Sequence, residues 1–384
     1  MNEIRAEAEA MKQSIIDDRR TLHMHPEIGM ELPRTTAYVS KRLREMGYAP
    51  QKPIDSGVTA DIGRPGKTIL LRADMDALPT KEEADLPFCS KNDYGHLCGH
   101  DMHTAMLLGA AKLLKAHEDE LAGTVRLMFQ PGEEGGMGAR AMVEAGVTEG
   151  VDAALALHVD SMAKAGTISY VEGVASTMME SFYITVQGRG GHGSSPHLTV
   201  DPLRVVVLIY DALNGLIGKE VDPAKTAVLT IGKLGGGSAV NIIPDTAEIW
   251  GAFRCYDLDV RDHLFKRVFE IVDHITKMMG ATYTLTKNVS TPGVMNDPAL
   301  CRALLPCVAD ILGEEALIRS ERPMSGTEDF AHVTKKVPGM YMMLGAGGPG
   351  GYPMHNPNVV FDEDALPLGS AILAHCALRW LERK

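Results

Sequence analysis

The sequence predicts an α/β protein of two domains, in which a mostly parallel-sheet α/β domain is interrupted by a ferredoxin-like α+β domain. Three observations lead to this expectation. The chain has 384 residues, which is more than one compact domain usually holds. Short apolar runs alternate with helical patterns in its first half, as in a parallel sheet covered on both faces. From about residue 178 the order becomes strand, helix, strand, strand, helix, strand.

The first part of the chain supplies the elements of a parallel sheet. A helix is expected from Ile4 to the His25-Pro26 pair, because apolar residues recur near the helical period and proline ends the helix. Strands are expected at 68–73, 124–129 and 152–157, and helices at 102–116 and 137–145. Strands that alternate with helices in this way are typical of βαβ units.

The middle of the chain has a different pattern. Apolar and polar residues alternate around Ile184, which predicts a strand with one face in water. Further strands are expected at 227–231, 247–253 and 282–286, and helices at 202–217 and 260–279. After Pro292 the chain again shows the pattern of helices and loops seen in its first part. We therefore expect residues 178–289 to form a domain inserted into a discontinuous one, made of residues 1–177 and 290–384.

Composition and charge exclude several classes of protein. With 38 Lys and Arg against 50 Asp and Glu, the net charge is −12, which argues against nucleic acid as a partner. No apolar run reaches the roughly 18 residues of a membrane span, and the charged N-terminal segment lacks a signal-peptide core. The spacing of the cysteines does not match that of a disulfide-bonded scaffold, which suits a protein of a reducing compartment. We expect a cytoplasmic protein without a nucleic-acid or membrane partner.

Polar residues directly follow each of the expected parallel strands. Asp74 and Asp76 follow the first, Glu133 and Glu134 the second, and His158 the third. Ligands bind at the carboxyl ends of the strands in open parallel sheets, so these residues are candidates for one site. For any single one of these residues there is an alternative explanation: the end of a strand can be polar simply because it is exposed to water.

Residues 96–103 concentrate one cysteine, three histidines and one aspartate. Thiolate, imidazole and carboxylate are the donors of zinc and its first-row neighbours. The spacing of Cys98 and His100 allows both side chains of an extended loop to reach one metal or a close pair. No paired C-x-x-C accompanies them, which disfavours a structural zinc finger. The alternative is that Asp101 caps a helix starting at Met102.

The adjacent Glu133 and Glu134 suit metal-assisted hydrolysis, because one can bind metal while the other takes a proton from water. An exposed acidic turn is the alternative.

His192 stands in a glycine-rich loop that lacks the Gly-Lys-Ser/Thr ending of a phosphate loop, and Asn241 follows a second such loop. The remaining cysteines lack a donor cluster and are expected to be small buried apolar residues, namely Cys89, Cys255, Cys301, Cys307 and Cys376.

Taken together, these motifs resemble the metal-dependent aminoacylase and carboxypeptidase superfamily. The resemblance is to its amidohydrolase branch, with hippurate hydrolases, plant auxin–amino acid hydrolases and bacterial N-acetyldiaminopimelate deacetylases. It spans nearly the whole chain. The motifs that carry it are HPEIG (25–29), LRADMDALP (71–79), HLCGHDMHTAMLLGAA (96–111), FQPGEEGGMGARAMVEAG (129–146), ALHVD (156–160), GRGGHGSSPH (188–197), NIIPDTAEIWGAFR (241–254), SGTEDFA (325–331) and MHNPNVVFDEDAL (354–366).

The resemblance implies a role for each candidate residue. Two divalent metal ions, zinc in the first place with manganese, nickel or cobalt as alternatives, would be held by Cys98, His100, Glu134, His158 and His355. Glu133 would be the general base, and Asp76 would orient a ligand histidine. His192 would act as a catalytic and substrate-binding histidine of the inserted lid, reaching a partner subunit's site. Asn241 and Arg254 would hold a substrate carboxylate. Asp74 replaces the histidine of the wider superfamily and is not expected to bind metal directly.

The function implied is hydrolysis of N-acyl amino acids, with an acetyl, benzoyl or longer acyl group, to a carboxylic acid and a free amino acid. Metal ions lower the pKa of bound water to about 7, and Glu133 takes its proton. A dipeptidase or carboxypeptidase with the same dinuclear centre is the alternative among enzymes. A non-catalytic metal-binding protein is the alternative of another class, although Glu133 argues against it. A homodimer or higher homo-oligomer is expected.

Overall fold

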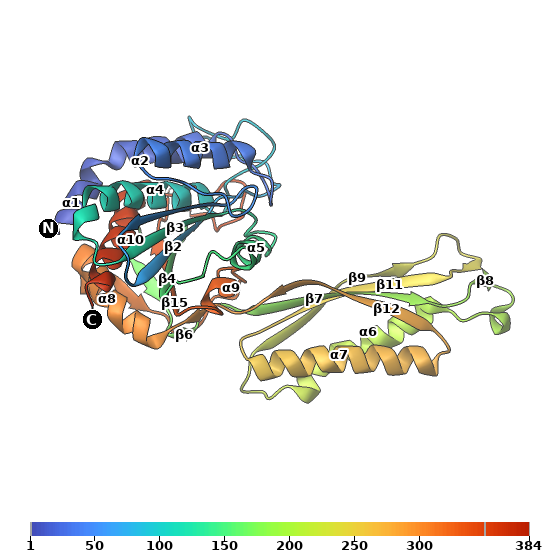
Figure 1. The fold of residues 1–384 in the computed structure, drawn as a ribbon. Coiled ribbons are helices and arrows are strands. Elements are labelled where there is room, and N and C mark those ends of the chain that lie inside the picture. Colours follow the sequence, from blue (N-terminus) through green and yellow to red (C-terminus); the bar gives the residue numbers. More distant parts are fainter. Residues whose placement is uncertain (1, 349–350, 384) are drawn as a thin grey trace. The chain divides into compact units, whose positions relative to one another are not determined.

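The computed structural model describes residues 2–348 and 351–383, apart from the side chains of 288 and 289. The chain divides into two compact units (Figure 1). The first comprises residues 1–175, 294–323 and 328–384. The second comprises residues 176–293 together with the short segment 324–327.

The first unit is built on a mostly parallel sheet in the order β1-β3-β2-β4-β15-β13-β6, with β5 beside β15 and β14 beside β5. The strands from β3 to β13 in this order run parallel, whereas β1 and β6 at the ends are antiparallel. The bounds are β1 Val58–Gly63, β2 Thr68–Asp74, β3 Thr124–Gln130, β4 Ala153–Asp160, β5 Ile168–Tyr170, β6 Gly173–Val174, β13 Met295–Asn296, β14 Leu317–Arg319 and β15 Gly339–Gly345.

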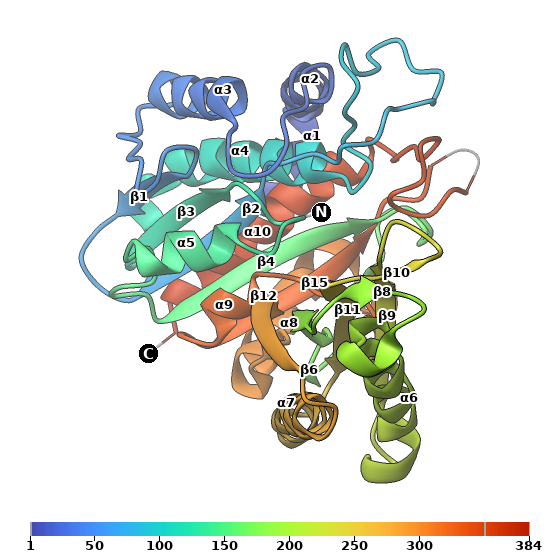
Figure 2. The ribbon, with the colours of Figure 1, turned by 90° about the vertical axis from the view of Figure 1, so that its right-hand side faces the viewer.

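Helices cover both faces of this sheet. Helices α4 and α10 pack against each other and against β2, and α1, α2 and α8 join them (Figure 1). Helices α5 and α9 pack together on the opposite face (Figure 2). The bounds are α1 Glu3–Ala10, α2 Lys12–His23, α3 Pro33–Glu45, α4 His100–Ala116, α5 Gly138–Glu144, α8 Pro298–Leu312, α9 Ala331–Thr334 and α10 Ala365–Leu381.

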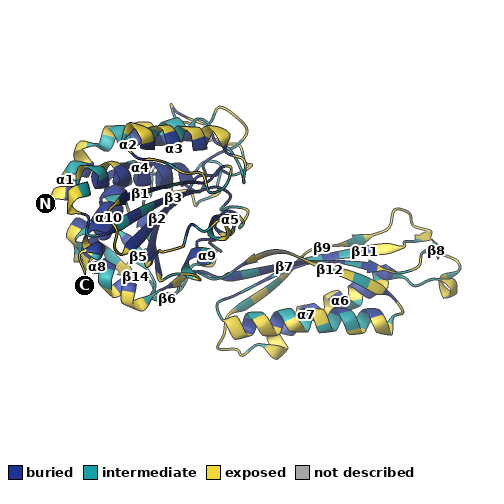
Figure 3. Cartoon of the chain, viewed as in Figure 1, coloured by how far each residue is buried: buried dark blue, intermediate teal, exposed yellow. Residues whose placement is uncertain are grey.

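The apolar sequence of the central strands explains their place in this unit. Every residue of β2 is buried, as is every residue of β4 except the last (Figure 3). A strand buried on both faces needs apolar side chains, which TILLRAD and AALALHVD supply apart from Arg72 and the polar residues at their ends. Since β2, β3 and β4 are neighbours and parallel, their carboxyl ends meet at one edge of the sheet.

The second unit has the order β7-α6-β9-β11-α7-β12 along the chain and an antiparallel sheet in the order β12-β7-β11-β9. This is the ferredoxin-like arrangement. The helices pack on each other and on the sheet over an apolar core that includes Phe182, Ile249 and Leu264. The bounds are β7 Met178–Gln187, β8 Gly191–His192, α6 Pro202–Glu220, β9 Ala227–Gly236, β10 Ile242–Ile243, β11 Thr246–Cys255, α7 Leu258–Met278 and β12 Thr282–Thr291.

The predicted fold class is confirmed, with differences in detail. The first helix is not continuous, because it breaks at Met11 into α1 and α2, and α2 ends at His23, before Pro26. Cys89 is exposed, so the expectation that it is buried is wrong, while the other cysteines are buried. Within the described part of the chain, no helix combines the length and apolar character needed to cross a membrane.

Candidate metal centre

The residues that follow the parallel strands lie together at one edge of the first unit's sheet. Asp74 ends β2, His158 lies in β4, and Glu133 and Glu134 follow β3. The carboxylate of Asp76 accepts the main-chain N–H of Glu133 at 3.0 Å and that of Glu134 at 3.2 Å. Asp76 therefore ties the loop after β2 to the loop after β3 and fixes the start of the glutamate pair.

The sulfur of Cys98 lies at the middle of a group of metal-binding side chains. Its Sγ is 3.5 Å from Nε2 of His158 and 3.3 Å from Nε2 of His355. The ligand atoms of Cys98, His100 and His158 lie within 4.8 Å of one another, as do those of Cys98, Glu134 and His355. Cys98 belongs to both sets, so the five predicted ligands form two overlapping groups of three.

The hydrogen bonds of the buried histidines direct one ring nitrogen of each toward this centre. Nδ1 of His100 is 2.8 Å from the main-chain oxygen of Asp76, and Nδ1 of His158 is 2.7 Å from that of Val159. A carbonyl oxygen only accepts, so Nδ1 of each ring carries a proton and Nε2 is the atom that can bind a metal. The Asp76 carboxylate is farther from His100 Nδ1, at 3.5 Å. His100 Nε2 and Glu134 Oε1 are among several buried polar atoms of the described residues that have no hydrogen-bond partner.

Burial and neighbouring charges shift the pKa values of this group. Burial raises the pKa of the Cys98 thiol well above its usual range. Burial holds the pKa of His158 well below its usual value, so its ring is neutral. Burial alone lowers the pKa of His100, but the nearby Asp74 and other acceptors outweigh it and raise the pKa strongly. Divalent metal binding would displace the protons on Cys98 and His100.

Two backbone features place these donors. Gly99 has φ of 87°, and a Cβ at this position would overlap Cγ2 of Val159, so glycine is required where the chain turns into α4. His355 also has a positive φ, 69°, a strained conformation for a non-glycine residue and one that recurs at functional sites. Its N–H donates to the oxygen of Leu97 at 2.9 Å, which fixes the loop of His355 against that of Cys98.

Asp101 does not cap a helix, so that alternative is wrong. Helix α4 begins before Met102, and Asp101 is fully buried inside its first turn. Its Oδ2 accepts from Nε of Arg19 at 3.0 Å and from Nδ1 of His23 at 2.8 Å. His23 Nε2 is also 2.9 Å from a carboxylate oxygen of Glu82. Asp101 therefore anchors α4 to α2 by a buried ion pair.

This contact predicts a pH dependence of stability. Burial alone lowers the pKa of His23, but Asp101 and Glu82 raise it more, so the folded-state pKa lies above 6.5. A pKa raised on folding gives stability that is present below the unfolded-state value and lost as the pH rises through the folded-state value. We expect the free energy of unfolding of the metal-free protein to fall as the pH rises above 6.5, and to fall by more in the natural chain than in His23→Gln. Urea unfolding of both proteins at a series of pH values measures this difference. Parallel profiles would contradict this account.

A buried arginine behind the centre was missed by the sequence analysis. Arg72 Nη1 is 2.8 Å from Oδ2 of Asp74, and its Nη2 is 2.8 Å from Glu328 and 3.1 Å from Asp329. Its Nε donates to Gln130 at 2.9 Å. Two features of the sequence could have indicated this network: an arginine inside the otherwise apolar run of β2, and the acidic pair Glu328-Asp329 in the motif SGTEDFA.

The same acidic pair lies close to Glu133. Carboxylate oxygens of Glu133, Glu328 and Asp329 lie within 4.8 Å of one another. Desolvation, followed by the charges of Glu328 and Asp329, raises the pKa of Glu133 well above its usual range. Burial likewise raises the pKa of Asp329 to about 8. A raised pKa at Glu133 is the direction required of a carboxylate that must accept a proton.

The other predicted site residues belong to the second unit. His192 lies in β8, where its Nδ1 accepts the main-chain N–H of Ser194 at 3.1 Å. Asn241 is exposed and directly precedes β10, which pairs with β8, so these two residues are neighbours. Arg254 lies in β11, with Nη1 3.5 Å from the hydroxyl of Thr327.

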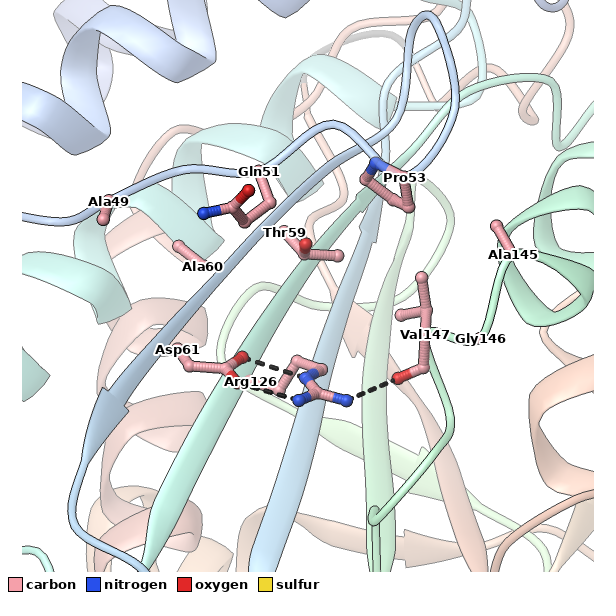
Figure 4. A pocket seen from close by; sticks show the side chains of 10 residues that line it. All are labelled: Ala49, Gln51, Pro53, Thr59, Ala60, Asp61, Arg126, Ala145, Gly146 and Val147. Carbon is pink, nitrogen blue, oxygen red and sulfur yellow. Dashed lines mark hydrogen bonds and ion pairs between the residues drawn. The ribbon is translucent and has the colours of Figure 1, made fainter.

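A separate cavity of about 450 Å³ contains none of these residues (Figure 4). Arg126 and Asp61 are its charged side chains, and the guanidinium of Arg126 is already bound by Asp61 and by the main-chain oxygens of Val147 and Glu149. Little donor capacity remains for a ligand. The lining residues are Ala49, Gln51, Pro53, Thr59, Ala60, Asp61, Arg126, Ala145, Gly146 and Val147.

Fold and centre together are those of a metallopeptidase-like hydrolase, and comparison with known proteins agrees. The model of peptidase family M20/M25/M40 matches residues 70–379. The chain belongs to this family.

Individual relatives are similar over almost the whole chain. The N-acetyl-L-cysteine deacetylase of Bacillus subtilis is 36% identical over 97% of this chain and 89% of its own. Thermostable carboxypeptidase 2 of Saccharolobus solfataricus is 37% identical over 98% of each chain. The solved structure of the YXEP protein of Bacillus subtilis, described as a dinuclear metal binding peptidase, has a TM-score of 0.82 at 32% identity and covers 97% of this chain and 99% of that chain.

Proposed function

We propose that this protein is a metal-dependent amidohydrolase that cleaves N-acyl amino acids to a carboxylic acid and a free amino acid. The observation that carries the proposal is the carboxylate of Glu133, which lies within 4.8 Å of ligand atoms of His100 and Glu134 and is additional to the five expected ligands. A protein that only binds metal has no need for such a carboxylate. The similarity to a deacetylase named for N-acetyl-L-cysteine supports the substrate class.

The residues of the centre fit two divalent metal ions. Cys98, His100, Glu134, His158 and His355 would hold them. The mixture of one thiolate, three imidazoles and a carboxylate favours zinc, with manganese, nickel and cobalt as alternatives. The relation to a dinuclear metal binding peptidase supports the number of ions, and the buried His100 Nε2, which has no hydrogen-bond partner, supports the assignment of ligands.

Bound ions would supply Lewis acidity and bring the pKa of water at the centre into the neutral range. Glu133 then accepts the proton of the attacking water and passes it to the leaving amine. Asp76 holds Glu133 in place through its main-chain N–H. As the family resemblance implies, we assign His192 to the developing oxyanion at a partner subunit's site, and Asn241 and Arg254 to the substrate carboxylate.

A panel of substrates tests this proposal against a carboxypeptidase. The relative from Saccharolobus solfataricus carries that name, so peptides belong in the panel. We expect the zinc-loaded protein to release amine from N-acetyl, N-benzoyl or longer N-acyl amino acids faster than from simple dipeptides. Faster release from dipeptides would favour the carboxypeptidase, and no release from either class would contradict hydrolysis.

Cys98→Ser tests the thiolate at the centre. Because Cys98 is shared by both groups of three donors, its loss should weaken binding of both ions, and we expect activity at limiting zinc to fall by about 10-fold or more. Dialysis against metal buffers measures the affinity. Mild peroxide should inactivate the natural chain, since a thiolate oxidises. Full activity after peroxide, with metal retained, would contradict the assignment of Cys98 as a metal ligand. The matched control is Cys307→Ser, which changes a buried cysteine away from the centre.

We also propose a cytoplasmic homodimer or higher homo-oligomer joined through the second unit. Strand β9 lies at the edge of that unit's sheet and exposes Val228 and Leu234. An open edge with apolar side chains pairs readily with a second copy. Sedimentation would measure the oligomeric state.

A further inference from the structure

We propose that His103 is a positioning residue that fixes His158 through the peptide groups on either side of Val159. The inference rests on the proposed function, since it takes His158 as a metal ligand. His103 lies one turn into α4, is buried, and was given no role by the sequence motifs.

Both ring nitrogens of His103 have a partner. Nδ1 is 2.6 Å from Oδ1 of Asp74, and Nε2 accepts the main-chain N–H of Val159 at 2.9 Å. Because Nε2 accepts a proton from Val159, the proton of the ring is on Nδ1 and is donated to Asp74. A single orientation and a single tautomer satisfy both contacts.

Val159 is held from the other side by His158 itself. Nδ1 of His158 donates to the oxygen of Val159 at 2.7 Å. The rings of His103 and His158 are 4.3 Å apart between centroids. His103 therefore fixes the N–H of Val159, and the carbonyl of Val159 fixes the ring of His158. In this orientation Nε2 of His158 faces the sulfur of Cys98 at 3.5 Å.

Asp74 is the fixed end of this arrangement. Its other carboxylate oxygen is 2.8 Å from Nη1 of Arg72, and its main-chain oxygen accepts from the hydroxyl of Thr104 at 2.9 Å. These contacts assign Asp74 to holding His103.

A direct metal site at His103 is the competing explanation. Ligand atoms of Asp74, His100 and His103 also lie within 4.8 Å of one another. However, Nδ1 of His103 carries the proton given to Asp74, and the lone pair of Nε2 is taken by the N–H of Val159. No ring nitrogen of His103 is left to bind a metal, which favours a positioning role.

Two variants separate the two contacts of His103. In His103→Asn the amide nitrogen stands near the place of Nδ1, keeping a donor for Asp74 but losing the acceptor for Val159. In His103→Gln the amide oxygen reaches the place of Nε2 and keeps that acceptor. His117→Asn, at the far end of α4 where the ring contacts Glu7 and Glu120, is the matched control.

The readouts are zinc affinity, measured by competition with a chelator, and the thermal midpoint of the metal-free protein. We expect His103→Asn to weaken zinc binding by about 10- to 100-fold, as the loss of a residue that orients a metal ligand does. His103→Gln should lose less, and His117→Asn should bind zinc as the natural chain does. A change of the thermal midpoint without a change of zinc affinity would mark a merely structural role.

Three results would overturn the proposal. They are unchanged zinc affinity in His103→Asn, a loss as large in His103→Gln as in His103→Asn, and failure of both variants to fold without metal, which would assign His103 to the fold as a whole. Failure of the proposed function is a different result, because the natural chain itself would then bind no zinc or hydrolyse no N-acyl amino acid.

Discussion

Glu133→Gln is expected to lower kcat for hydrolysis of an N-acyl amino acid by about 10²- to 10⁴-fold. The amide of glutamine keeps the size of the side chain but cannot accept the proton of the attacking water. The main-chain contact of residue 133 with Asp76 does not depend on the side chain, so the centre should keep its form. Steady-state rates and zinc content, measured on the same samples, check this prediction.

The matched control is Glu144→Gln, which removes an exposed carboxylate on α5 that pairs with Arg140. It should keep the natural rate. A Glu133→Gln protein that binds zinc normally and retains more than about a tenth of the natural rate would contradict the role of Glu133 as general base.

Arg72→Met is expected to destabilise the protein by about 3–5 kcal/mol, the cost typical of removing one partner from a buried ion pair. Arg72 is buried and is within 3.1 Å of carboxylate oxygens of Asp74, Glu328 and Asp329. Methionine keeps most of the side-chain volume but leaves these carboxylates without their cation. Urea unfolding of the metal-free protein measures the change.

Arg140→Met is the control for this comparison, because Arg140 forms an exposed pair with Glu144 and should contribute about 0–1 kcal/mol. A loss below about 1 kcal/mol in Arg72→Met would mean that the carboxylates around Arg72 are held by other groups, and the account of this network would be wrong.

The fold could be predicted from sequence because its strongest signals are local. Fully apolar runs give the buried parallel strands, and alternating residues give the second unit's half-exposed sheet. The break at Met11 could not be predicted, because neither proline nor glycine marks it and the apolar spacing continues across it. The exposure of Cys89 depends on the packing of a loop, which no periodicity encodes.

The candidate centre was partly predictable for a geometric reason. Parallel neighbouring strands bring their polar ends to one edge, so Asp76, Glu133 and His158 were expected near one another. The buried partners were not predictable from the pattern, because they lie far apart along the chain. Arg19 and Asp101 are 82 residues apart, and Arg72 and Glu328 are 256 apart.

His355 shows the limit of residue patterns most clearly. No strand end or donor cluster surrounds it in the sequence, and only the family resemblance singled it out. Its contact with Cys98 comes from a loop fixed by the main-chain bond to Leu97 and by a strained backbone. Its side chain is 55% exposed, unlike the other predicted ligands.

The most direct test of this account is a zinc titration of the metal-free protein in which bound zinc and amine release from an N-acyl amino acid are followed together. We expect no hydrolysis without metal and a rate that rises and levels off at two ions per chain, the number that the similarity to a dinuclear metal binding peptidase supports. Equal hydrolysis by the metal-free protein would contradict it. Stoichiometric zinc binding without hydrolysis of any N-acyl amino acid or dipeptide would contradict it as well.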